Sequence, residues 1–155
     1  MTASGHVRVT SIVHAVVVVN DMERALGFYR DLLGLRVAQD FVHDPALLGR
    51  LMPYERPRVR AVLLKAPDGT EVELAEFRSP RGRSDAGEWP DAGIRSLTFR
   101  VEDLAGAVRA LGAAGVQFMS EPVAQPLDDG SVAEVVYCRG PDDVIVTLAQ
   151  LPPGR

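Results

Sequence analysis

Two side chains in this chain, one in an apolar run and one in a strand-like segment of mixed polarity, have the chemistry of proton transfer and metal binding. His14 interrupts the apolar run IVHAVVVV, and Glu73 lies in the segment TEVELAEF. An imidazole beside a carboxylate can act as a general base with an orienting partner, and both groups are ligands for divalent metals. A lone strand histidine is more often a core residue than a catalyst, so the place of His14 in the chain has to decide between these interpretations.

An internal repeat gives both residues a counterpart. The segment VNDM before the first predicted helix aligns with VEDL before the second, and APDGTEVELAEF aligns with GPDDVIVTLAQL near the end of the chain. In these alignments Ser96 takes the place of His14, and Thr147 takes the place of Glu73. The first half therefore has metal-type side chains where the second half has hydroxyls.

Hydrophobic periodicity predicts a strand, a helix and three further strands in each half. We expect the first strand to be covered on both faces because it is a continuous run of β-branched residues. Aspartate caps and glycine stops bound both helices. The predicted elements are strand 12–19, helix 21–33 and strands 35–42, 58–65 and 70–77, then strand 94–101, helix 103–114 and strands 116–119, 132–138 and 144–149.

The second half offers polar side chains on one strand face. Alternation places Ser96, Thr98 and Arg100 together, opposite an apolar face. The guanidinium of Arg100 suits a carboxylate or another oxyanion, although its place near the strand end is also that of an ordinary surface residue.

The segment HDPALLGRLMPYERP at residues 43–57 is too apolar for a simple linker. Its apolar residues include Leu47, Leu51 and Met52. Two interpretations remain open. The segment folds as a short helix over the mouth of a cavity, or it packs on the flank of the domain.

Size and charge exclude several classes of protein. The chain has 155 residues, a net charge of -4 and one cysteine, Cys138. The acidic balance argues against nucleic-acid binding, and no apolar run reaches the length of a membrane span. We expect a soluble, cytoplasmic protein with a single domain over residues 1–155. Within it, residues 9–77 form the first unit, residues 78–92 a linker that contains Trp89, and residues 93–151 the second unit.

The segments VHAVVVVNDMERALGFYRDLLGL, APDGTEVELAEF, GIRSLTFRVEDLAGAVRALGAAGV and YCRGPDDVIVTLAQL together resemble the vicinal oxygen chelate superfamily. This superfamily includes glyoxalase I, extradiol dioxygenases, methylmalonyl-CoA epimerase and bleomycin-resistance proteins. The resemblance implies an α+β fold in which two βαβββ units form a curved, partly closed mixed sheet, commonly in a homodimer. In metal-dependent members four strand positions, typically His, Glu, His and Glu, line a cup. Here those positions hold His14, Glu73, Ser96 and Thr147.

The resemblance leaves three functions open. The first is an isomerase, lyase or cyclase of specialised metabolism that moves a proton on a small oxygenated, neutral or anionic metabolite. His14 and Glu73 would be catalytic, with no metal or a weakly held Zn, Mn, Ni or Fe ion. Ligand binding would fall to Ser96, Thr98, Arg100, Thr147, Leu51 and Met52.

The second function is a metal-free drug-sequestering protein of the bleomycin-resistance type. The third is a divalent-metal-dependent glyoxalase, epimerase or extradiol dioxygenase, in which another side chain such as Glu134 completes the ligand set.

Overall fold

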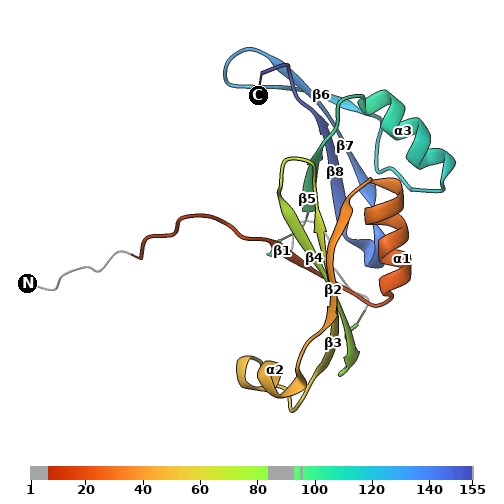
Figure 1. Cartoon of the computed structure of the whole chain (residues 1–155). Helices are drawn as coiled ribbons and strands as arrows, with labels where there is room; N and C mark the ends of the chain where they lie inside the picture. The colour runs from red at the N-terminus through yellow and green to blue at the C-terminus, as the bar shows by residue number, and fades with distance from the viewer. Residues whose placement is uncertain (1–6, 84–92, 95, 155) are drawn as a thin grey trace, which may run out of the picture.

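The computed structural model describes residues 7–83, 93–94 and 96–154, so Trp89 and most of the predicted linker lie outside the described residues. The described chain forms two four-stranded mixed sheets, in the strand orders β1-β4-β3-β2 and β5-β8-β7-β6 (Figure 1). The first sheet contains β1 (Ala15–Val19), β2 (Arg36–Val42), β3 (Arg58–Lys65) and β4 (Glu71–Ser79), and the second contains β5 (Ser96–Arg100), β6 (Val123–Pro126), β7 (Val132–Arg139) and β8 (Ile145–Gln150). The predicted architecture of two βαβββ units is confirmed.

Each unit pairs its first strand in parallel with its last, and the remaining pairs are antiparallel. The parallel pair needs a crossover, which the helix of each unit supplies. The β3–β4 connection is the predicted turn, where Gly69 has φ +93. The two units therefore have the same topology.

The first helix begins where the sequence predicts, at the cap residue Asp21, whose side chain accepts a hydrogen bond from the backbone N–H of Arg24. It continues as α1 (Met22–Leu26) and then as a π-helical segment, η1 (Gly27–Leu32). The π-helical turn was not predicted, because hydrophobic spacing does not distinguish it from an α-helix. Gly34, at φ +75, provides the left-handed residue that ends the helix.

The second unit differs from the prediction in one strand. Residues 116–119 form only an isolated bridge, from Phe118 to Cys138, and the paired strand is β6, further along the chain. The backbone N–H of Val116 closes the end of α3 (Leu104–Ala113) by donating to the carbonyl of Leu111. The segment still lies against β7, because the N–H of Met119 donates to the carbonyl of Tyr137 and the N–H of Arg139 donates to the carbonyl of Gln117.

One apolar core joins the two units. Tyr29 is fully buried in this core, together with Val19 and Leu74 of the first sheet and Leu148 of the second. Figure 1 shows α1 and α3 on the same side of the two sheets. We call this side the helix-covered face and the opposite side the open face. The core therefore sits between the two helices and the helix-covered faces of the sheets.

The first strand is not covered on both faces, contrary to the sequence prediction. Val17 and Val19 are buried in the core, but Val16 and Val18, which point the other way, are 53% and 51% exposed. A β-branched run predicts the strand but cannot say which of its faces finds a neighbour within the same chain. Among the described residues no helix is long and apolar enough to cross a membrane.

Candidate active site

His14 and Glu73 lie together in the structure. The His14 Nε2 atom is 3.6 Å from the Glu73 Oε2 atom, with side-chain exposures of 32% and 15%. This distance is within ion-pair range and slightly longer than a hydrogen bond. The pair is accessible enough to meet a ligand, and its carboxylate is largely shielded from solvent.

The pair sits on the open face of the first sheet. Glu73 is the register partner of Val16 on β1, and its sequence neighbours Val72 and Leu74 are buried in the core on the other face. His14 comes immediately before β1, because the ladder to β4 begins at Ala15. The imidazole therefore lies just before the first residue of the strand. The sequence had predicted His14 inside the strand.

The corresponding positions of the second sheet hold hydroxyls. Thr98 of β5 is the register partner of Thr147 of β8, just as Val16 is the partner of Glu73. Leu97 packs against the core, so Thr98 lies on the open face. The same alternation places Ser96 and Arg100 on that face, beside Ile145 and Ala149 respectively.

Thr147 is buried although it belongs to the open face. It is 6% exposed, and its hydroxyl oxygen has no hydrogen-bond partner among the described residues. A buried hydroxyl without a partner costs roughly 1–3 kcal/mol. Its neighbour on β7 is Tyr137, which sequence analysis did not select. Repeat alignment of β7 with β3 would have placed Tyr137 opposite Thr147, as Leu63 stands opposite Glu73.

The segment at residues 43–57 folds as a short helix, α2 (Pro45–Leu51), on the open face of the first sheet. Leu48 is buried against Val59 and Ala75, and Met52 packs on the same cluster. Leu51 is 73% exposed. Because Ala75 lies two residues from Glu73 on the same face, α2 covers the same sheet face as the His14–Glu73 pair, on the side of Glu73 that is away from His14.

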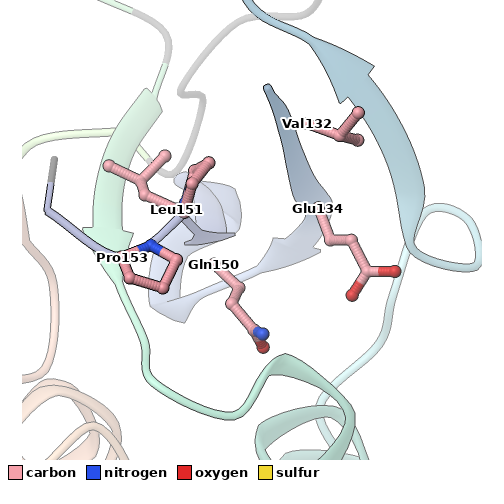
Figure 2. Close-up of a pocket in the computed structure, with 6 residues that line it drawn as sticks. Val132, Glu134, Gln150, Leu151 and Pro153 are labelled. Atoms are coloured by element: carbon pink, nitrogen blue, oxygen red, sulfur yellow. The ribbon is translucent and has the colours of Figure 1, made fainter. Parts of the chain in front are cut away.

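Glu134 does not complete a metal site with the pair. It is the register partner of Gln150, and these two residues share the helix-covered face with Val136 and Leu148. There Glu134 lines an open pocket of about 390 Å³ beside α3 (Figure 2). Its carboxylate therefore faces away from Thr147 and the hydroxyls of the open face.

The donor set does not fit a tightly held catalytic metal. His14 and Glu73 provide two ligands, whereas a catalytic zinc site ordinarily has three protein ligands. In the described part of the chain no group of three or more His, Cys, Asp or Glu side chains could hold a metal ion. Thr147 at the fourth position is a neutral hydroxyl, which is a poor ligand for such ions.

Comparison with known proteins gives a family from the sequence and the matching fold from solved structures. The model of the glyoxalase/bleomycin resistance protein/dioxygenase superfamily matches residues 11–148. The chain is 27% identical to a 2-epi-5-epi-valiolone epimerase from an Actinomyces species, over 99% of this chain and 86% of that protein.

Solved structures with the same fold include a glyoxalase family protein from Bacillus cereus, with a TM-score of 0.82 and 23% identity over 96% of this chain and 98% of that one. Glyoxalase I from Leishmania major matches with a TM-score of 0.64 and 19% identity, over 92% and 87% of the two chains.

Proposed function

The chain belongs to the glyoxalase/bleomycin resistance protein/dioxygenase superfamily, and on this basis we propose that it is an isomerase-type enzyme. Its reaction moves a proton on a small oxygenated metabolite, and epimerisation next to a carbonyl group is the form that we favour. The same acid/base pair would also serve a lyase or cyclase that begins with proton removal.

The observation that carries the proposal is the 3.6 Å contact between His14 Nε2 and Glu73 Oε2 on the open face. A protein that only sequesters a ligand has no chemical need of a base with an orienting carboxylate. The pair supplies both parts of a general-base system.

Each group has a defined role in the proposed step. The neutral imidazole of His14 takes the proton from the carbon next to the carbonyl, and the electron pair of the broken C–H bond moves into the enolate. The carboxylate of Glu73 stabilises the imidazolium that forms. Solvent water donates a proton to the other face of the same carbon, and the His14 imidazolium releases its proton to solvent. The configuration is thereby inverted, and no oxidant or reductant is consumed.

The epimerase among the similar proteins supports this choice within the superfamily. Its likeness covers 99% of the present chain, so both His14 and Glu73 fall within the matched region. At 27% identity the relative supports the class of reaction, and the substrate of this chain is a separate question.

We place the working enzyme in a homodimer. Val16 is the register partner of Glu73 on β1. It and Val18 on the same strand are half exposed on the open face. A second copy of the chain, or the ligand itself, would cover them. Light scattering on a sizing column tests this part, and a monomer at micromolar concentration would contradict it.

Deuterium uptake from D₂O into small ketones, followed by proton NMR, tests the reaction. The probes are dihydroxyacetone, cyclohexanone and pentahydroxycyclohexanone. We expect Glu73→Gln and His14→Ala to lower the exchange rate of the best probe by about 100-fold or more. Glu134→Gln is the matched control, because it alters a strand glutamate on the helix-covered face.

Thermal melting accompanies the kinetics. Glu73→Gln should melt within about 2 °C of wild type, since the pair is partly exposed and contributes little to folding. A Glu73→Gln variant that exchanges normally, or that loses activity only because it unfolds, would contradict the proposal. Tight binding of a probe without exchange would favour the sequestering protein instead.

A further inference from the structure

The open face of the second sheet has a row of three hydroxyls that the first sheet lacks. Thr98, Thr147 and Tyr137 are register partners across β5, β8 and β7. The corresponding row in the first sheet is Val16, Glu73 and Leu63. The two sheets therefore differ in chemistry at equivalent positions. The first sheet has a carboxylate flanked by two apolar side chains, and the second has three adjacent hydroxyls.

All three side chains of the row lie on the same face of the sheet. Leu148 and Val136, which adjoin Thr147 and Tyr137 in sequence, are buried in the core on the helix-covered face. Alternation along the strands therefore directs the row to the open face. This is also the face on which His14 and Glu73 lie in the first sheet.

The central member of the row lacks a partner. The Thr147 hydroxyl is buried and unpartnered among the described residues, while Thr98 is exposed and Tyr137 is 40% exposed. A ligand hydroxyl placed over this row could bond the accessible members directly, and a rotation of the buried Thr147 side chain toward the open face would let the ligand supply the bond that Thr147 is missing. An apolar ligand would leave that bond unmade, at a continuing cost in free energy.

The chemistry of the row indicates the class of ligand. A hydroxyl both donates and accepts hydrogen bonds, so it matches other hydroxyls, which do the same. Adjacent strands are about 4.8 Å apart, so the row is long enough to contact several substituents of one small ring. A carboxylate would be better served by a cationic donor, and the row contains none, since Arg100 on the same face lies beside Ala149 and outside the row.

We propose that Thr98, Thr147 and Tyr137 bind the hydroxyl groups of a polyhydroxylated ketone whose carbonyl end meets His14 and Glu73. The inference rests on the proposed function, because it assigns the substrate class of the same site. It adds Tyr137 as a ligand-contacting residue that determines specificity, and it makes the substrate a neutral polyol ketone rather than an anion.

Affinity measurements on paired probes test the inference without turnover. Pentahydroxycyclohexanone and cyclohexanone share the ring and the carbonyl but differ in the hydroxyls. Titrations followed by NMR of the threonine methyl groups give the dissociation constant of each. We expect wild type to bind pentahydroxycyclohexanone more tightly than cyclohexanone. Thr147→Val and Tyr137→Phe should each raise the dissociation constant of pentahydroxycyclohexanone about 10-fold, because each variant loses about one hydrogen bond to it.

Two controls separate recognition from folding. Thr70→Val makes the same change in the β3–β4 turn, where the hydroxyl bonds to Asp68, and should leave both affinities unchanged. Thr147→Val should melt at or above the wild-type temperature, because it removes an unpartnered buried hydroxyl. Binding of cyclohexanone should be the same in all variants.

The outcomes distinguish the two proposals. Row-dependent binding of pentahydroxycyclohexanone without deuterium exchange would refute the proposed function and keep the inference. Exchange that depends on Glu73 but is insensitive to Thr147→Val and Tyr137→Phe would overturn the inference alone. Equal affinity of wild type for the two probes, no binding of either, or stronger binding of a carboxylate analogue such as quinate would also overturn it.

Discussion

Asn20 donates two hydrogen bonds to the carboxylate of Asp142, across 122 positions of the chain. Its backbone N–H lies 3.0 Å from one oxygen, and its side-chain nitrogen lies 3.2 Å from the other. The contact ties the β1–α1 junction of the first unit to the β7–β8 turn of the second. Among the residues that the structure describes, the repeat shows no second copy of this contact, because Glu102 takes the place of Asn20 and Asp68 bonds to Thr70 within its own turn.

We expect Asp142→Ala to destabilise the fold more than Asp143→Ala. Both residues have left-handed backbones, with φ of 56 and 61, so both alanine variants carry a strain of about 1–2 kcal/mol. Only Asp142 also loses the part-buried hydrogen bonds to Asn20, worth about 2 kcal/mol more. Urea unfolding measures the difference, and equal losses in the two variants would show that the Asn20 contact adds no stability.

Alanine at two helix glycines should have opposite effects. Gly27 has helical dihedrals, φ -55 and ψ -36, and no atom within 4 Å of the added Cβ, so Gly27→Ala should stabilise by about 0.5–1 kcal/mol. Gly34 is equally open but sits at φ +75, so Gly34→Ala should destabilise by about 1 kcal/mol. Thermal melting of both variants is the measurement. A loss on Gly27→Ala would mean that the π-helical turn itself needs glycine.

Stability should fall at alkaline pH because of Cys138. Burial raises the pKa of this thiol to about 11, against about 8.5 in an unfolded chain. Below the lower value the thiol is neutral in both states. Between the two values the unfolded chain releases its proton first, so the free energy of unfolding decreases as pH rises. Urea titrations from about pH 7 to pH 10 should therefore show a steeper decline for wild type than for Cys138→Ala, and parallel curves would contradict this.

Metal affinity should depend on the hydroxyls of the second half. Calorimetric titration of zinc, manganese, nickel and ferrous iron should show weak binding to wild type and weaker still to His14→Ala, since two side chains are a poor ligand set. Ser96→His combined with Thr147→Glu should create a tight site, with at least a 100-fold gain for zinc. A double variant that gains nothing would show that the four positions do not converge.

The metal content of the purified wild-type protein also tests the expectation of a weak site. Near-stoichiometric metal in protein purified without chelator, lost in His14→Ala, would contradict the weak-site expectation. It would return the metal-dependent lyases, epimerases and dioxygenases of the superfamily to consideration.

Most of the fold could be predicted because the relevant signals are local. Asp21 and Asp103 cap helices wherever the chain places them, and β3 was predicted with the bounds that the structure shows. The strand predicted at residues 116–119 is reduced to a single bridge to β7, and the longer ladder is made by β6, because the pairing of a strand depends on a partner that is distant in the sequence. The π-helical turn after Leu26 likewise has no separate sequence period.

The sequence could predict which strand positions correspond in the two halves of the candidate site. It could not predict every side chain that lies on the open face. The repeat placed Glu73 against Thr147, and the matching registers of the two parallel pairs agree with that alignment. The sequence did not select Tyr137, because nothing in its own strand distinguishes it from a surface tyrosine. It also offered Glu134 as a metal ligand, although β7 turns that side chain to the helix-covered face.

The sequence by itself determined the repeat, the order of its elements and the alternation of each strand, since these depend on residues close together in the chain. Only the tertiary structure decided that Val16 and Val18 remain exposed, that His14 lies 3.6 Å from Glu73, and that the buried Thr147 hydroxyl finds no partner within the described part of the chain. Each of these depends on atoms from distant segments. Strand periodicity says which face a side chain takes, but packing between segments decides what that face meets.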